Sequence, residues 1–289
     1  MPSVLGIHIP DHLRQAWSRW LAPDPQPFFV AASHPFVDAG EERLELSPEL
    51  RDTYRTWNVD RSLSIAWLTE EHFMSLSRRE RASLVRAQAA CGRGAVPTVR
   101  SWADLLEADR LRAQADGHRF VWWPSLLATN AVKVLARFVS TQRSVSRHRE
   151  VSPSTWTDAI DQVPGARSLA GTFPDGSGPN CFGTVMAACG ESHAAGAWIL
   201  DAQFESWLGE KTRAGGQDGS PGTVLVWRNR DRIAQHAAVT IGDGWALEKP
   251  SQEWHSPRVI LPVRDLIQRN RVAGLRLHRR AVITQAAVP

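Results

Sequence analysis

The residues with the clearest chemical potential in this chain are a cysteine, a histidine and a glutamate in its second half. Cys181 lies in "GPNCFG", directly ahead of the apolar stretch "TVMAACG", whose composition predicts a helix. Unpaired N–H groups and the helix dipole stabilise an anion at a helix start, so the pKa of this thiol should fall. The alternative is a structural cysteine, because free cysteine is among the most buried residue types.

His236 and Glu248 are placed to activate such a thiol. The segment "RIAQHAAVTIGDG" puts His236 early in a strand, and its final "GDG" predicts a tight hairpin. The returning strand "WALEK" brings Glu248, twelve residues after His236, within side-chain reach across the ladder. A carboxylate there would hold the imidazole in one tautomer, giving a nucleophile, a base and an orienting group. Taken alone, a strand histidine is more often structural.

The elements around these residues predict an α+β domain over residues 151–289. A short capped helix, "SPSTWTDAIDQV", precedes the loop "GTFPDGSGPN" and the helix that begins at Cys181. A further helical stretch, "GAWILDAQFESWL", leads through the loop "RAGGQDGSPG" to four short β-favouring runs. These runs are "TVLVWRN", "AQHAAVTI", "WALEK" and "RVILPV". We therefore expect a helix packed on an antiparallel sheet.

Residues 1–150 predict a mainly helical region whose role the sequence does not indicate. Apolar residues recur at helical spacing over 59–90, as in one amphipathic helix or a helical pair. The stretch 101–116 opens with Ser101 and Asp104, which resemble a capping box, and 125–141 repeats the helical period.

Composition narrows the class of protein. Hydrophobic residues make up 43% and charged residues 22% of the 289 residues, as in a folded globular protein of one or two domains. No run of eighteen apolar residues and no secretion signal is present, and Cys91, Cys181 and Cys189 are too few for a disulfide scaffold. We expect a cytoplasmic protein with reduced thiols, no membrane partner and Cys189 in the core.

The basic isoelectric point does not indicate a nucleic-acid partner. Basic and acidic residues number 20 and 17 in residues 1–150, and 14 and 13 in residues 151–289. The value of about 9.4 arises because 31 of the 34 basic residues are arginine, which hardly deprotonates. The densest basic stretch, 77–94, has the spacing of a solvated helix face. The sequence contains no P-loop, GxGxxG or zinc-ligand spacing, so we expect neither a cofactor nor a metal.

Residues 172–262 resemble the NlpC-like cysteine peptidases of the papain-like superfamily and their CHAP amidase relatives. The resemblance rests on "NCFG", a cysteine that opens a helix near a glycine, on the strand "PGTVLVW" and on "HAAVTIGDGWALE". The third catalytic position of that family falls twelve residues after its histidine, where this chain has Glu248. Phe173 stands near the position where the family commonly has a tyrosine.

The resemblance implies a papain-like fold and an acyl-cysteine mechanism. Cys181 would be the nucleophile, with its N–H in an oxyanion hole, His236 the general base and then acid, and Glu248 its orienting group. The implied activity is a thiol-dependent hydrolase that cleaves an amide bond in a peptide or acylated small molecule. Two alternatives stay open: acyl transfer or amide formation by the same Cys–His pair, and a non-catalytic binding or interaction protein on this scaffold.

Three aromatic residues are candidates for substrate binding. Trp245, beside the predicted hairpin, and Trp254 are either core residues or the lining of a cleft near His236. Phe173 is the third candidate, because it lies shortly before the cysteine motif.

Overall fold

The computed structural model describes residues 3–36, 45–114, 117–141 and 143–283. The chain divides into two compact units, one formed by Met1–Ile9 with Gln142–Pro289 (unit 1) and one by Pro10–Thr141 (unit 2). The ranges expected from the sequence place the first nine residues and 142–150 with the N-terminal region, whereas they pack in unit 1. Backbone pairing accounts for this, because the N–H of Ser146 donates to Leu5 at 2.9 Å and that of Arg147 donates to Ile260 at 2.9 Å.

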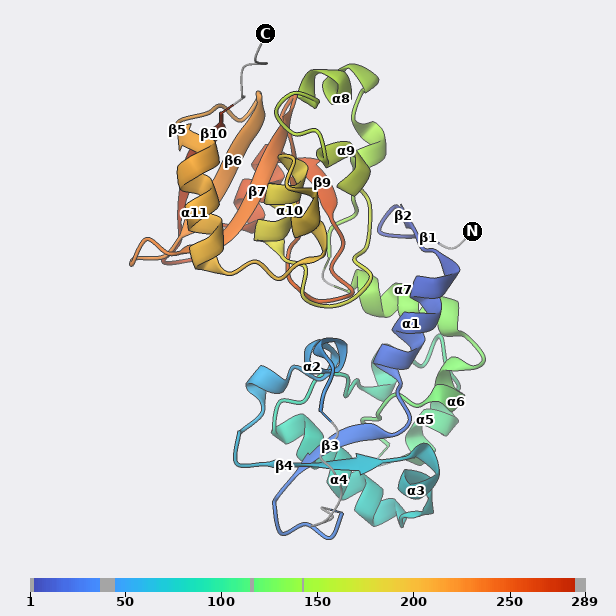
Figure 1. The fold of residues 1–289 in the computed structure, drawn as a ribbon. Helices are drawn as coiled ribbons and strands as arrows, with labels where there is room; N and C mark the ends of the chain where they lie inside the picture. Colours follow the sequence, from blue (N-terminus) through green and yellow to red (C-terminus); the bar gives the residue numbers. More distant parts are fainter. Residues whose placement is uncertain (1–2, 37–44, 115–116, 142, 284–289) are drawn as a thin grey trace. The chain divides into compact units, whose positions relative to one another are not determined.

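Unit 1 has the expected α+β architecture, built on a six-stranded sheet (Figure 1). Neighbouring strands are antiparallel and follow the order β5-β10-β6-β7-β8-β9. The strands are β5 (Thr212–Ala214), β6 (Pro221–Arg228), β7 (Ala234–Gly242), β8 (Trp245–Glu248), β9 (Val259–Pro262) and β10 (Arg276–Val282). The predicted hairpin joins β7 and β8 through a turn whose three residues, Gly242, Asp243 and Gly244, all have positive φ.

Helices cover both faces of this sheet. The helices are α8 (Pro153–Ala159), α9 (Ala166–Leu169), α10 (Cys181–Ala188), α11 (Asp201–Lys211) and α12 (Val263–Arg269), with short 3-10 turns η3 (His148–Glu150) and η4 (Ser192–Gly196). Along β6, Val224 and Val226 pack in the cluster with α10 and α11, and Leu225 and Trp227 pack in the cluster with α12. Successive side chains of a strand point to opposite faces, so the strand is buried on both sides. A small hairpin of β1 (Ser3–Val4) and β2 (Ile7–His8) completes the unit.

Unit 2 is mainly helical around a two-stranded sheet of β3 (Gln26–Val30) and β4 (Ser64–Leu68). Its helices are α1 (Asp11–Leu21), α2 (Pro48–Tyr54), α3 (Glu70–Ser75), α4 (Arg78–Ala90), α5 (Ala108–Gln114), α6 (Pro124–Leu127) and α7 (Ala131–Ser140), with 3-10 turns η1 (Thr56–Asn58) and η2 (Val99–Ser101). An aromatic core holds the sheet and helices together, with ring centroids 5.7 Å apart for Phe28 and Phe73 and 5.3 Å apart for Phe73 and Trp123.

Two helical predictions in unit 2 need correction, those for 59–90 and 101–116. Residues 64–68 of the stretch 59–90 form β4, because pairing with β3 buries Ala66 and Leu68. Ser101 is not a helix cap: its hydroxyl donates to the Thr98 carbonyl at 2.8 Å, and Asp104 pairs with Arg137 at 2.6 Å. The stretch 125–141 forms two helices, α6 and α7. Helix α5 begins only at Ala108, and residues 115–116 lie outside the described residues.

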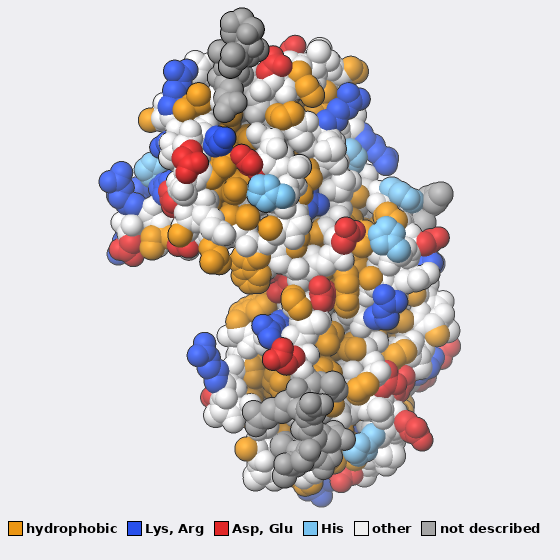
Figure 2. All heavy atoms as spheres, in the orientation of Figure 1, with side chains coloured by type: hydrophobic (Ala, Val, Ile, Leu, Met, Phe, Trp, Pro, Cys, Tyr) orange, Lys and Arg blue, Asp and Glu red, His pale blue; other side chains and the backbone are white. Residues whose placement is uncertain are grey.

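Charged side chains of both signs are interspersed over the face of the molecule shown in Figure 2. This distribution agrees with the near balance of acidic and basic residues in each half of the sequence. Among the described residues, no helix combines the length and the apolar composition that crossing a membrane requires.

Candidate active site

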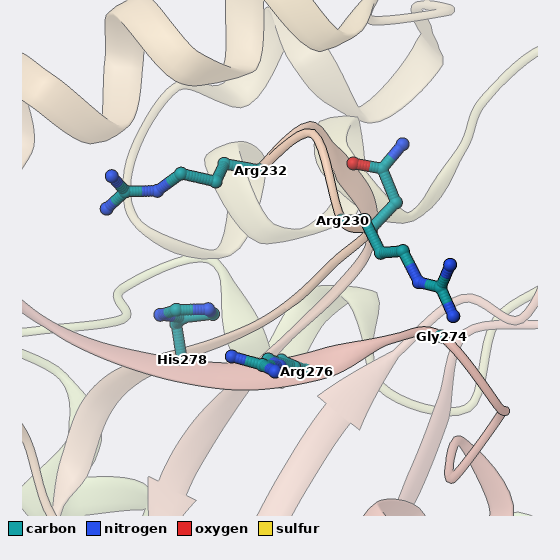
Figure 3. A pocket seen from close by; sticks show the side chains of 6 residues that line it. Arg230, Arg232, Gly274, Arg276 and His278 are labelled. Atoms are coloured by element: carbon teal, nitrogen blue, oxygen red, sulfur yellow. The ribbon is translucent and has the colours of Figure 1, made fainter.

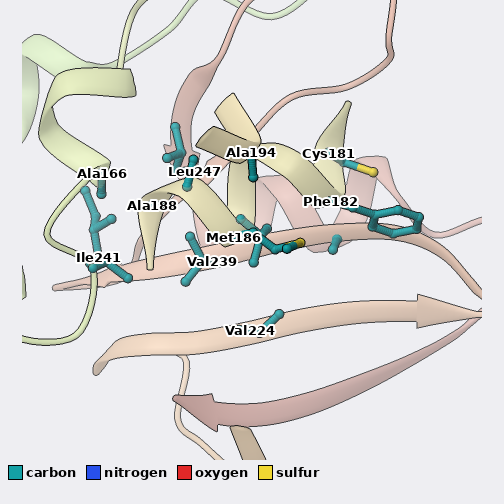
Figure 4. Close-up of a cluster of buried hydrophobic side chains, with 14 of the residues drawn as sticks. Ala166, Cys181, Phe182, Met186, Ala188, Ala194, Val224, Val239, Ile241 and Leu247 are labelled. Atoms are coloured by element: carbon teal, nitrogen blue, oxygen red, sulfur yellow. The ribbon is translucent and has the colours of Figure 1, made fainter. Parts of the chain in front are cut away.

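Cys181 occupies the first helical position of α10 in unit 1 (Figure 4). The preceding residue, Asn180, caps the helix: its side-chain oxygen accepts the N–H of Gly183 at 3.0 Å. The Asn180 amide also donates to the carbonyl of Ile199 at 2.7 Å, which fixes the entry to the helix against the segment before α11. No described residue accepts a hydrogen bond from the N–H of Cys181 itself. The Cys181 thiol therefore lies at a helix N-terminus with an unused backbone donor.

Gly183 allows another part of the chain to lie close to this turn. A Cβ added at Gly183 would be 2.4 Å from the carbonyl oxygen of Ala194 and 3.1 Å from that of Ala197. A glycine at this position predicts close approach of another segment or of a substrate. In the structure, the backbone of η4 and of the residue after it makes this close approach. The glycine thus positions the first turn of α10 against η4.

His236 lies near the start of β7, opposite Trp227 of β6. The centroids of the two rings are 5.4 Å apart, so the buried indole packs against the imidazole and limits its rotation. Across the β7–β8 ladder, Glu248 pairs directly with Ala238. Ala238 comes two residues after His236, so the side chains of His236 and Glu248 lie on the same face of the sheet. From this diagonal position a carboxylate oxygen of Glu248 lies 3.0 Å from His236 Nε2.

The thiol and the imidazole interact electrostatically. Burial alone would raise the pKa of the Cys181 thiol, but a hydrogen bond to the His236 side chain, the charge of its ring and the N–H groups of Ala237 and Phe182 lower it below the ordinary value. Because Nε2 of His236 contacts Glu248, Nδ1 is the nitrogen left to face the sulfur. The side chain of His236 is 12% exposed and Cys181 is 8% exposed.

Two residues at the end of α12, Arg269 and Asn270, contact Glu248 and are not indicated by the sequence. The side-chain amide of Asn270 donates to the same Glu248 oxygen that contacts His236, at 3.0 Å, and Arg269 forms an ion pair with the other oxygen. His236 and Asn270 thus contact one oxygen of a fully buried carboxylate, and Arg269 supplies a positive charge without which the carboxylate would be costly to keep ionised. Only the tertiary placement of α12 brings them to Glu248, so no local sequence signal identifies them.

One of the three aromatic candidates, Trp245, lies away from His236. Trp245 pairs with Gly242, six residues along β7 from His236, which corresponds to roughly 20 Å at the usual rise of a strand. Its ring instead packs under the Arg147 guanidinium, 4.9 Å from the ring centroid. Trp254 is fully buried and Phe173 is 7% exposed, so both have the burial of core residues.

Cys189 differs from Cys181 in its surroundings. It follows the last residue of α10, where the helix dipole disfavours a thiolate. Burial of the thiol and the negative charge of Glu191 raise its pKa to about 12. The described residues include no group of histidine, cysteine, aspartate or glutamate side chains that could hold a metal ion.

The structure thus brings together Cys181, His236 and Glu248 from a helix, a strand and the next strand. An imidazole oriented by a carboxylate can take a proton from the thiol and later return it to a leaving group. Comparison of the sequence with protein-family models and with curated proteins, and of the structure with solved structures, gives no match.

Proposed function

We propose that this protein is a thiol-dependent hydrolase that cleaves an amide bond in a peptide or acylated small molecule. The observation that carries the proposal is the Cys181–His236–Glu248 arrangement, with the thiol at a helix N-terminus and the carboxylate 3.0 Å from Nε2 of the imidazole. Unit 1 would then be a papain-like domain of the NlpC-like kind, since a helix with a cysteine at its start packs on an antiparallel sheet bearing the histidine. We further propose a cytoplasmic location, in keeping with the sparse cysteines.

In this mechanism His236 takes the thiol proton of Cys181, and the sulfur attacks the carbonyl carbon of the amide. The resulting oxyanion accepts the free N–H of Cys181, and loss of a donor of this kind costs about 3 kcal/mol in other enzymes. The C–N bond breaks as His236 protonates the leaving amine, which leaves an acyl-cysteine. Water, deprotonated by His236, then releases the acid and restores the thiol.

Acyl transfer is the second candidate. Cys181 and His236 are little exposed, which would shield an acyl-cysteine from bulk water and favour an amine acceptor. Added primary amines would then divert product from the free acid to a new amide, measured by mass spectrometry. Exclusive release of the acid at every amine concentration would exclude transfer to the amines supplied.

The test of the proposed hydrolase is turnover of a peptide library, followed by mass spectrometry of the products. We expect Cys181→Ala to lower the rate by at least about 1,000-fold, because the nucleophile is lost. Cys189→Ala is the matched control and should retain the rate, since this thiol lies outside the arrangement.

Reactivity of the thiol separates an enzyme from an inert scaffold. At neutral pH we expect iodoacetamide to alkylate Cys181 faster than the same cysteine in the urea-unfolded chain, because the folded environment lowers its pKa. Equal rates in the two states, together with no cleavage of any library peptide, would favour a binding protein over an enzyme.

A further inference from the structure

A pocket of about 540 Å³ lies in unit 1 between the β6–β7 connection and the start of β10 (Figure 3). None of its lining residues belongs to the candidate active site. Figure 3 shows Arg276 and His278 on one strand and Arg230 and Arg232 on the connection facing it. The lining residues are Asn229, Arg230, Arg232, Gly274, Arg276 and His278.

The pocket concentrates positive charge. Three of its six lining residues are arginines and none is a carboxylate, although residues 151–289 as a whole have 14 basic and 13 acidic residues. In the described part of the chain, Arg230, Arg232 and Arg276 form no ion pair, and the nearest acid in sequence, Asp231, is exposed and does not line the pocket.

An adjacent pocket of about 410 Å³ provides the contrast. It shares Arg232 and His278 with the first, but two of its other arginines form ion pairs with acids and the third, Arg280, donates to Thr212. Arg228 forms an ion pair with Glu205, and Arg279 pairs with Asp218 at 2.7 Å. The first pocket therefore differs in that none of its three arginines has an ion-pair partner among the described residues.

Arg232 is held in a backbone conformation that favours glycine. Its φ is +66°, and the turn is fixed because the N–H of Arg232 donates to the carbonyl of Asn229 at 3.1 Å and that of Ile233 donates to the Asn229 side chain at 2.9 Å. A non-glycine residue in this region is strained, and such strain is found preferentially at binding and catalytic sites. An arginine here keeps a positive charge at the pocket at the expense of backbone strain.

We infer that this pocket binds the phosphate group of a small phosphorylated molecule. The planar fork of a guanidinium matches two oxygens of a phosphate, and the pocket volume lies in the range of small-ligand sites. Apart from the His278 imidazole, the lining has no ring on which nucleobases could stack, which favours a small ligand over single-stranded nucleic acid.

The protonation of the His278 imidazole should show whether the pocket holds a ligand. Burial lowers the pKa of this imidazole, and the charges of Arg228, Arg232 and Arg276 lower it further. A bound phosphate would oppose those charges, so we expect the imidazole to gain protons when the pocket fills. The other charged groups that line the two pockets around it are Glu205, Arg230, Arg279 and Arg280.

The test is calorimetric titration of Cys181→Ala protein with pyrophosphate, inorganic phosphate and ADP. Arg276→Gln should weaken pyrophosphate binding at least tenfold, whereas Arg167→Gln, which removes an exposed arginine on α9, should change it less than twofold. Arg232→Gly should also weaken binding at least tenfold without lowering Tm, because glycine fits a φ of +66°. ADP binding as tightly as pyrophosphate would assign the ligand to nucleotides, and tighter pyrophosphate binding would assign it to simple phosphates.

Proton uptake is followed through the His278 ring resonance, identified by its absence in His278→Gln. Pyrophosphate should raise the pH midpoint of that resonance in the parent protein and leave it unchanged in Arg276→Gln. Equal affinity in Arg276→Gln, equal loss in Arg167→Gln, or tighter binding of a single-stranded oligonucleotide than of any small phosphate would overturn the inference. Turnover is not needed, so failure here is distinguishable from failure of the proposed thiol chemistry.

Discussion

At the scale of single residues, the candidate site depends on opposing effects at one sulfur. Burial disfavours the Cys181 thiolate, while the His236 ring and two backbone N–H groups favour it, and the second influence prevails. The imidazole is in turn fixed by Glu248 on one side and by the Trp227 ring on its neighbouring strand. Glu248 and Trp227 therefore affect the thiol by holding the His236 ring in place. The pH dependence of thiol reactivity is the property to measure.

The pH at which Cys181 becomes reactive should change when His236 is removed. Thiolate is the reacting form, so a lowered pKa places the midpoint of alkylation below the usual value of about 8.5. In His236→Ala the effect of burial is no longer opposed by the ring, and the midpoint should rise above that value. Mass spectrometry of the Cys181 peptide after iodoacetamide treatment at a series of pH values measures it. Gln235→Ala, at an exposed neighbouring position, should leave the midpoint unchanged, and an unchanged midpoint in His236→Ala would exclude this interaction.

At the scale of elements, the Cys181 thiol is positioned by close packing of α10 against η4. Gly183 permits this contact because its missing side chain leaves room for two backbone carbonyls. Asn180 joins α10 to the segment between η4 and α11 through its hydrogen bonds to Gly183 and Ile199. The start of α10 is therefore held by its contacts with the segment that leads to α11.

Alanine substitutions at two helical glycines should have opposite effects. Gly183→Ala places a Cβ 2.4 Å from the Ala194 carbonyl oxygen, so we expect a loss of about 1 to 3 kcal/mol in the free energy of unfolding and slower Cys181 alkylation. Gly209→Ala in α11 has open space around the new Cβ and should raise the stability by up to about 1 kcal/mol. Urea unfolding measures both, and a Gly183→Ala protein as stable as Gly209→Ala would contradict the proposed packing role.

At the scale of the whole molecule, one of the two units is built from two separate stretches of the chain. Unit 1 combines Met1–Ile9 with Gln142–Pro289, and unit 2 lies between them in the sequence. The β1–β2 hairpin lies before unit 2 in the sequence but packs in unit 1, where Ser146 connects it to β9. Ser146 accepts the N–H of Ile260 through its hydroxyl at 3.2 Å and donates its own N–H to Leu5. The two stretches of the chain that form unit 1 are thus joined by hydrogen bonds through Ser146.

Substitutions on either side of the boundary at Ile9 and Pro10 should therefore destabilise different units. Ile7→Ala and Leu13→Ala each remove a buried side chain, 1% and 4% exposed, and each should cost about 2 to 5 kcal/mol. Hydrogen exchange should show lost protection in the unit 1 sheet for Ile7→Ala and in unit 2 for Leu13→Ala. Loss of protection in β3 and β4 after Ile7→Ala, with β9 unaffected, would show that the hairpin does not support unit 1.

The sequence predicts the parts of the site that depend on local signals. The helix that begins at Cys181 and the "GDG" hairpin both follow from residues within a few positions of each other, and they account for the placement of Cys181, His236 and Glu248. The prediction for 64–68 was wrong because a short apolar run is compatible with either a helix or a strand until its partner is known.

Long-range packing determines what the sequence could not predict. Arg269 and Asn270 reach Glu248 only because α12 packs on the sheet face that bears it. Trp245 and Trp254 were interpreted as possible cleft residues because apolar surface and core have the same composition, and only the fold places the first at the far end of β7 and the second in the interior. The insertion of β10 between β5 and β6 likewise has no local signal.

That insertion also determines the order in which the protein can assemble on the ribosome. The β7–β8 hairpin, with His236 and Glu248, requires only neighbouring residues and can form as soon as it emerges. One edge of β6 waits for β10, so until β10 emerges the nascent chain carries Cys181, His236 and Glu248 beside an incomplete sheet. The sheet behind the candidate site would therefore be completed only when β10 closes the gap between β5 and β6.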